Sequence, residues 1–156
     1  MQEMEEEEKG TWKQKEKTMQ TGVLNEGRCA VQQGIHAELT EKILKCAFRV
    51  QNTLGCGFLE KVYENAMAVA LRKEGLKTFQ QVSMHVHYQG VQVGEYLADM
   101  VVEGAVLVEV KATEQHHGIH VSQVLNYLKA TNLPVGLLLN FGSPRLFYRR
   151  LELKDT

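Results

Sequence analysis

The stretch that decides the fold is Tyr96–Lys111, with the sequence YLADMVVEGAVLVEVK. Two apolar runs flank Glu103-Gly104, and this pair predicts a tight turn because glycine accepts the positive φ that such turns require. The segment is therefore expected to form a β-hairpin, with Asp99 in its first strand and Glu109 and Lys111 in its second.

Three charged side chains interrupt this otherwise apolar hairpin. Side chains alternate across a strand, so Glu109 and Lys111 share one face while Val108 and Val110 point to the other. Burying these charges, with Asp99, among apolar neighbours is unfavourable unless they are paired or bind a metal. Two carboxylates and one ammonium on neighbouring strands fit a site for a hard divalent cation and a phosphate.

Three motifs resemble those of a known group of enzymes. The D…ExK pattern of Asp99, Glu109 and Lys111 on a hairpin resembles the PD-(D/E)XK nuclease superfamily. Gly57–Tyr63, with the sequence GFLEKVY, matches the signature of the GxxExxY protein family within it. Gln123–Tyr127, with the sequence QVLNY, resembles the QxxxY motif of the RecB-like branch. Together, in this order and spacing, the three motifs are specific.

This resemblance extends from about Leu39 to about Leu151, with one departure. Ala98 stands where the superfamily name has Pro, which supplies geometry rather than chemistry. The resemblance implies an α/β (α+β) fold with the restriction-endonuclease-like αβββαβ core, a mixed sheet flanked by helices.

The resemblance also implies the site. The residues expected to be catalytic are Asp99, Glu109, Lys111, Glu60, Gln123 and Tyr127. The metal, Mg²⁺ or Mn²⁺, would be held by Asp99, Glu109, Glu60 and the Val110 carbonyl. The substrate would contact Tyr63, Gln123 and Tyr127.

Apolar periodicity and turn residues predict the remaining elements. The order is helix, helix, three antiparallel strands, helix, strand and strand. The expected helices span Thr40–Leu54, Phe58–Lys73 and Ile119–Ala130. The first strand spans Phe79–Tyr88, the second begins at Val91–Gly94 and continues into the Asp99 strand of the hairpin, and the third is the Glu109 strand. The last two strands span Val135–Phe141 and Arg145–Leu151.

Glu60 and Tyr63 lie on the second expected helix, whose core stripe is predicted to be Leu59, Val62, Ala66 and Val69. Spacing alone favours a solvated Glu60 at the positive end of the helix dipole. The superfamily resemblance reverses this preference and directs Glu60 into the metal site. Tyr63 could pack in the core, or its hydroxyl could bind a carboxylate or a phosphate.

Two further groups of polar residues can be explained without any role in the site. Gln123 and Tyr127 are four apart on one helix flank, where spacing leaves a polar flank and a role in the site about even; their position just after the ExK strand favours the site. His116, His117 and His120 cluster in a loop without a complete zinc motif, so an inert surface cluster is favoured.

Composition limits the class of protein. A chain of 156 residues, 44% hydrophobic and 24% charged, fits one globular domain, expected over residues 37–153. Residues 1–36 are Glu-rich at the start and lack an apolar period, which predicts a disordered tail. The net charge of −1 gives no overall attraction to nucleic acid. Three cysteines without CxxC spacing indicate a reducing cytoplasm, and no apolar run is long enough to span a membrane.

The predicted function is a metal-dependent nuclease that hydrolyses phosphodiester bonds of nucleic acid, with DNA favoured. The alternative is a non-catalytic module that retains the fold and binds nucleic acid or protein. A third interpretation is hydrolysis of another phosphate ester, because fold does not fix substrate. The oligomeric state stays open, and a homodimer is one of the possibilities.

Overall fold

The structure, a computed structural model, describes residues 34–115 and 118–153. The predicted N-terminal tail falls almost entirely outside these residues, as do His116 and His117. The described elements are helices α2 (Ala37–Leu54), α3 (Glu60–Lys73) and α4 (Gly118–Thr131), and strands β1 (Thr78–Tyr88), β2 (Val91–Val102), β3 (Val106–Lys111), β4 (Val135–Asn140) and β5 (Phe147–Glu152). The predicted αβββαβ order is confirmed, with β5 following.

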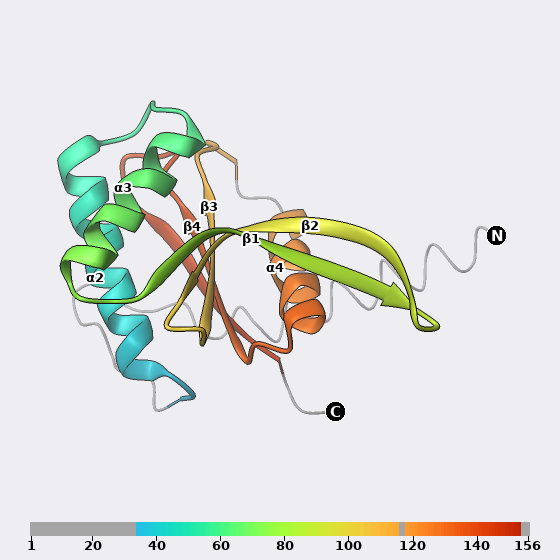
Figure 1. The fold of residues 1–156 in the computed structure, drawn as a ribbon. Coiled ribbons are helices and arrows are strands. Elements are labelled where there is room, and N and C mark those ends of the chain that lie inside the picture. Colours follow the sequence, from blue (N-terminus) through green and yellow to red (C-terminus); the bar gives the residue numbers. More distant parts are fainter. Residues whose placement is uncertain (1–33, 116–117, 154–156) are drawn as a thin grey trace. The chain divides into compact units, whose positions relative to one another are not determined.

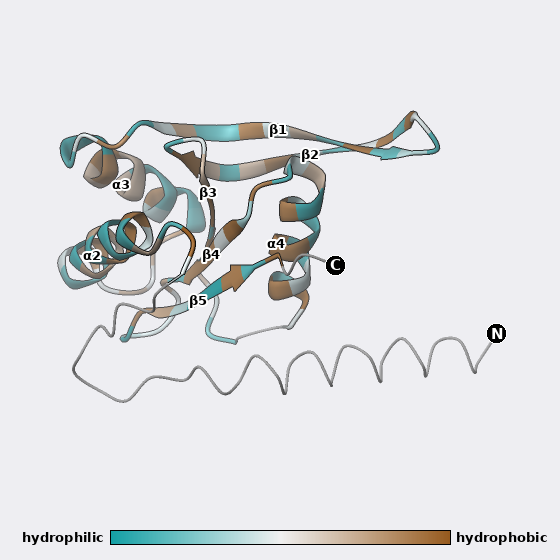
Figure 2. Ribbon diagram, turned by 90° about the horizontal axis from the view of Figure 1, so that it is seen from below, coloured by the Kyte–Doolittle hydropathy of each residue, from teal (hydrophilic) through white to brown (hydrophobic). Residues whose placement is uncertain are grey.

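The five strands form one mixed sheet in the order β1-β2-β3-β4-β5. Strands β1, β2 and β3 are antiparallel, β3 and β4 are parallel, and β5 returns antiparallel to β4. Helices α2 and α3 lie on one side of the sheet and α4 on the other (Figures 1 and 2). This is the predicted α+β arrangement of a mixed sheet flanked by helices.

Strand β3 shows how the two faces of the sheet are used. Val106, Val108 and Val110 belong to the apolar core beneath α2 and α3. Glu109 alternates with them, so it points to the α4 side. All six residues of β4 are buried, as predicted for a strand covered on both faces.

The hairpin turn is confirmed. Glu103 and Gly104 both have positive φ, at 54° and 63°. The strands that flank this turn pair in register, with Met100 opposite Val108 and Val102 opposite Val106. One further step along this register brings Asp99 opposite Glu109.

The predicted core stripe of α3 is wrong. Leu59, Val62 and Val69 are exposed. The buried face lies one position along the helix and comprises Tyr63, Glu64, Met67, Ala68 and Leu71. The prediction assigned the most apolar positions to the core. The buried face instead includes two polar side chains, Tyr63 and Glu64, which find hydrogen-bond partners elsewhere in the fold.

Helix α2 buries Ile43, Ala47 and Val50 on the face that packs in the core. The helix begins at Ala37, three residues before the predicted start, and Thr40 is buried within its first turn. No helix among residues 34–115 and 118–153 is both long and apolar enough to cross a membrane.

Strands β1 and β2 are much longer than the strand that follows them. Their ladder runs from Thr78 opposite Val102 to Tyr88 opposite Val91, whereas β2 pairs with β3 only over Met100–Val102. The remainder of β1 and β2 continues past the sheet as a two-stranded ribbon (Figure 1). The point where β2 leaves β3 is the place where the candidate site is found.

Candidate active site

Asp99 lies at the fork where β2 separates from β3. The Val110 backbone N–H donates a hydrogen bond of 2.8 Å to Asp99 Oδ2. Beyond Met100 the β2–β3 backbone ladder supplies no acceptor for this N–H, so the Asp99 side chain accepts its hydrogen bond instead. This contact fixes the Asp99 carboxylate against β3, beside Glu109.

Glu109 is a buried carboxylate that is only half satisfied. Its Oε1 accepts a hydrogen bond of 2.9 Å from Lys111 Nζ. Its Oε2 is buried and has no hydrogen-bond partner among the described residues. Burial, and then the neighbouring Asp99 carboxylate, raise the pKa of Glu109 to about 7. An oxygen in this state is a ready ligand for a cation.

Asp99 and Glu109 share one side of the sheet. They are opposite in register, and the charge of Asp99 raises the pKa of Glu109. Burial also raises the pKa of Asp99, while the hydrogen bond from Val110 and the Lys111 ammonium oppose that rise. Two such carboxylates favour a bound cation because a positive charge relieves the cost of ionising both.

Lys111 links the two strands to helix α3. Its Nζ lies 2.9 Å from Glu109 Oε1 and 3.8 Å from Glu60 Oε1. Burial works to lower the pKa of Lys111, but the charge and hydrogen bond of Glu109 and the charge of Glu60 outweigh it and leave that pKa raised. Lys111 is therefore a stable cation at neutral pH and cannot serve as a base.

Glu60 occupies the first turn of α3 and reaches the site from its edge. Its side chain is partly exposed, and its pKa is raised by burial and by Asp99, against the pull of Lys111. A backbone hydrogen bond from Ala112 also acts on it. The structure thus brings Glu60 close to Lys111. The resemblance to the superfamily implied a position for Glu60 on this side of the fold.

Gln123 and Tyr127 approach the same centre from α4. Gln123 Nε2 donates to the Tyr127 hydroxyl at 2.6 Å. Burial raises the pKa of Tyr127, and the charges of Glu109, Lys111 and Asp99 also act on it. The expected pair is therefore formed and lies within electrostatic reach of the carboxylates.

Tyr63 lies away from this centre, which corrects the expectation that it contacts substrate. It is fully buried and stacks on Phe141, with ring centroids 4.8 Å apart. Its hydroxyl donates to the Gly55 carbonyl at 2.7 Å and accepts from the Phe58 N–H at 3.2 Å. Tyr63 fixes the loop that leads into α3, and through that loop the start of the helix at Glu60.

Glu64 is a polar residue of this region that the sequence prediction missed. Its two oxygens accept hydrogen bonds from Lys61, Gln80 and Gln81. Those hydrogen bonds outweigh burial and lower its pKa. Gln81 has a φ of 51° and lies between Gln80 and Val82, whose partners on β2 are the two neighbours of Asp99. Glu64 therefore ties α3 to the strand beside Asp99.

Asn140 was also missed. Its side chain bonds the Thr113 N–H and carbonyl, at 3.1 and 2.9 Å, and the Gly142 N–H at 3.0 Å. It pairs with Lys111 across β3 and β4. A Cβ at Gly142 would stand 2.3 Å from the Thr113 backbone, so only glycine allows this approach. These hydrogen bonds of Asn140 fix the segment that follows Lys111. In the sequence, the signal for this role was a single polar residue at the end of an apolar strand.

The donors at the fork suit a hard cation, although they are few. Among residues 34–115 and 118–153, no group of three or more His, Cys, Asp or Glu side chains is placed to hold a metal. The available ligands are Asp99, Glu109 with its unsatisfied oxygen, and the Val110 carbonyl, which points to the same side of β3 as its N–H. Mg²⁺ is commonly held by one or two carboxylates, with water and substrate phosphate completing its shell. The residues present fit such an ion.

The fold and the site define an α+β domain with an acidic centre at a strand fork. The sequence profile of the PD-(D/E)XK nuclease superfamily matches residues 37–151, and the chain belongs to this superfamily. The superfamily is one of nucleases, and its members typically use divalent metals.

Two solved structures resemble this fold. SSO0001 has 15% identity and a TM-score of 0.47, over 78% of this chain and 60% of that one. LHK-Exo, an alkaline exonuclease from Laribacter hongkongensis, has 13% identity and a TM-score of 0.47, over 80% of this chain and 74% of that one. The chain thus spans less than two thirds of the length of SSO0001. No curated protein matches the sequence.

Proposed function

We propose that this protein is a nuclease that uses Mg²⁺ or Mn²⁺ to hydrolyse phosphodiester bonds of DNA, within the GxxExxY family and the RecB-like QxxxY branch. The observation that carries the proposal is the pairing of Asp99 and Glu109 at the fork, with one Glu109 oxygen buried and without a partner. Cytoplasmic location stays a prediction from cysteine usage.

Asp99, Glu109 and the Val110 carbonyl would hold the cation. When bound, a divalent ion there supplies Lewis acidity, which polarises a phosphate oxygen and acidifies nearby water. Asp99 and Glu109 must both be ionised to hold the ion, and Lys111 favours that state through its charge.

Lys111 contributes a fixed positive charge next to the scissile phosphate. It remains protonated, so it stabilises negative charge that develops on the phosphate oxygens and donates hydrogen bonds to them. Glu109 and Glu60 hold its ammonium from two sides. Glu60 is partly exposed, and it is placed to accept a hydrogen bond from the attacking water.

Gln123 and Tyr127 complete the α4 side of the site. The short hydrogen bond between them orients the Tyr127 hydroxyl. That hydroxyl can then donate to a phosphate oxygen or support the Lys111–Glu109 pair. Both roles depend on their position rather than on proton transfer, because the Tyr127 pKa is raised.

The test is hydrolysis of labelled single-stranded and double-stranded DNA, and of RNA, by the full chain with Mn²⁺ or Mg²⁺. Asp99→Asn, Glu109→Gln and Lys111→Ala are each expected to lower kcat/KM at least about 100-fold. Glu95→Gln, which changes an exposed carboxylate on the same strand as Asp99, serves as the matched control and should retain activity.

Calorimetric titration with Mn²⁺ separates the nuclease from a non-catalytic module. Wild-type protein should bind the ion, and Glu109→Gln should lose that binding. Equal hydrolysis by wild type and all three site variants would trace the activity to a contaminant. Metal binding absent from the wild type, with no hydrolysis of any substrate, would overturn the proposal in favour of the module.

A further inference from the structure

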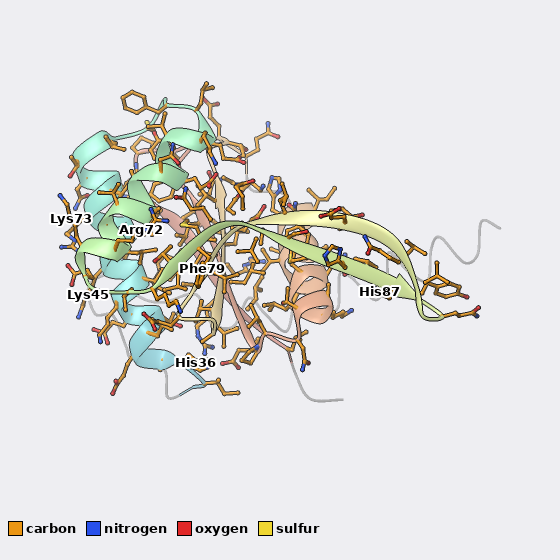
Figure 3. All side chains as sticks on the ribbon, viewed as in Figure 1. His36, Lys45, Arg72, Lys73, Phe79 and His87 are labelled. Carbon is orange, nitrogen blue, oxygen red and sulfur yellow. The ribbon has the colours of Figure 1, made fainter. Side chains whose placement is uncertain are left out.

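The outer part of the β1–β2 ribbon is exposed on every side in the described part of the chain. We define the arm as Val82–Ala98, the residues of β1 and β2 that extend past the last β2–β3 pair. Its inner end is covered: Met84 is buried, and the Tyr96 ring lies 5.9 Å from that of Tyr127 on α4. Its outer end, from His87 to Val93, is exposed throughout (Figures 1 and 3).

This outer end carries large apolar side chains that are exposed to solvent. Tyr88, Val91 and Val93 are 67%, 65% and 60% exposed. A two-stranded ribbon alone is marginally stable in water, and three or more strands or a covering helix are normally needed. An apolar ribbon without that support indicates a surface that is covered by a partner.

The charge of the ribbon excludes a phosphate-rich partner. No Lys or Arg occurs between Thr78 and Val102. Its charged residues are Glu95 and Asp99, both acidic. Nucleic acids and anionic membranes are held through cationic side chains, so both would be repelled here. The partner is therefore a protein surface that is itself apolar and uncharged.

The outer edge of β1 supplies such a surface. Strand β1 is the edge of the sheet, and no described strand pairs with its far side. Cations meet its first residues, because Arg72 donates to the Thr78 carbonyl and Lys77 lies over the Phe79 ring. Its outer part, Val82–Tyr88, includes no Asp, Glu, Lys, Arg or Pro. Natural edge strands are usually protected against pairing by such residues. Val82–Tyr88 lacks such residues, and only the register shift between Val86 and His87 interrupts it, so this part of the edge is suited to add another strand.

We propose that β1 pairs antiparallel with β1 of a second copy of this chain, so that the two sheets become continuous across a twofold axis. In such a contact each residue meets its symmetry-related surface, so a charged edge would repel itself. Val82–Tyr88 includes no Asp, Glu, Lys or Arg, which makes this part of the β1 edge self-complementary. The free edge of β2 is less suitable, because pairing there would bring two Glu95 carboxylates together.

The test measures the mass of the full chain by light scattering over a range of concentrations. Wild-type protein should be a dimer that dissociates on dilution. His85→Lys/His87→Lys adds charge to exposed positions of β1 and should halve the mass (Figure 3 labels His87). Gln89→Lys/Gln92→Lys adds the same charge to the tip and to β2, and this control should remain dimeric.

A charge swap distinguishes loss of pairing from loss of folding. His85→Glu/His87→Glu should also be monomeric, and mixing it with the Lys variant should restore a dimer of one chain of each kind. Wild-type protein that is monomeric at every concentration overturns the proposal. A dimer that survives in the Lys variant, or variants that do not recombine, also overturns it. These outcomes do not depend on hydrolysis, so they are independent of the nuclease test.

Discussion

Replacing Glu109 with glutamine should stabilise the fold while removing activity. The carboxyl is 2% exposed, and burial with the Asp99 charge raises its pKa from 4.5 to about 7. A difference of this size corresponds to about 3 kcal/mol between the ionised and neutral forms of Glu109 in the folded state. Glutamine has nearly the same shape and cannot ionise, so it removes this penalty.

The sign of the effect sets its pH dependence. Because the folded-state pKa is above the unfolded-state pKa, protonated Glu109 favours folding. That contribution is complete below about pH 4.5 and is lost as the pH rises through about 7. We therefore expect Glu109→Gln to exceed wild type by about 3 kcal/mol at pH 8.5, and by less than about 1 kcal/mol at pH 5.

The assay is urea unfolding followed by circular dichroism at pH 5, 7 and 8.5, with EDTA present. Asp99 is present in both proteins, and because its charge acts on Glu109, the measured difference includes that coupling. Glu95→Gln, which changes an exposed carboxylate on β2, is the matched control and is unfolded under the same three conditions. Addition of Mn²⁺ at pH 8.5 should stabilise wild type, since an ion that binds only the folded state raises its stability, and should leave Glu109→Gln unchanged.

Two results would refute this reasoning. A stability difference that is the same at all three pH values would mean that Glu109 is not a buried charge. Equal stabilisation of both proteins by Mn²⁺ would mean that the ion is held elsewhere. In either case the fork would lose its assigned role, even if the chain still cleaved DNA.

Three further substitutions distinguish a residue that acts in hydrolysis from residues that stabilise the fold. Lys111→Met should abolish hydrolysis while Mn²⁺ binding stays detectable by calorimetry, because Lys111 is not a ligand of the ion; hydrolysis at the wild-type rate would contradict this. Tyr63→Phe should cost about 1–2 kcal/mol in urea unfolding through its lost hydrogen bonds, with KM for DNA unchanged, and a raised KM would return it to the substrate site. Glu64→Gln should destabilise by about 2 kcal/mol at pH 7. Since its pKa is lowered in the fold, that loss should fade as the pH drops through the native pKa, and a loss independent of pH would argue against an ionised Glu64.

Local sequence was sufficient to predict the hairpin. The Glu103-Gly104 turn fixes the register, because shifting the pairing by one residue would move every side chain to the other face. Once that turn is set, Asp99 must fall opposite Glu109, and alternation must put Lys111 beside Glu109. The electrostatic core of the candidate site thus follows from about sixteen consecutive residues, with no long-range information.

Helix α3 could not be oriented in the same way. Leu59, Val62 and Val69 are as regularly spaced as the residues that are buried, and they are more apolar than Tyr63 and Glu64. A prediction from periodicity places the most hydrophobic side chains in the core. A polar side chain can also be buried, however, when it finds hydrogen-bond partners. Those partners lie in the Gly55 loop and in β1, and only the tertiary structure brings them together.

The position of Asp99 depends on a difference in strand length that no local pattern reveals. Strand β2 has 12 residues and β3 has 6, so β2 must leave β3 and continue without it. A main-chain N–H at such a fork is left without an acceptor, and burying it unpaired would cost about 1–3 kcal/mol. Asp99 supplies the acceptor, and the same contact aims its carboxylate at Glu109. The fork therefore creates both the acidic centre and the arm, and a chain whose β3 extended to match β2 would lose both.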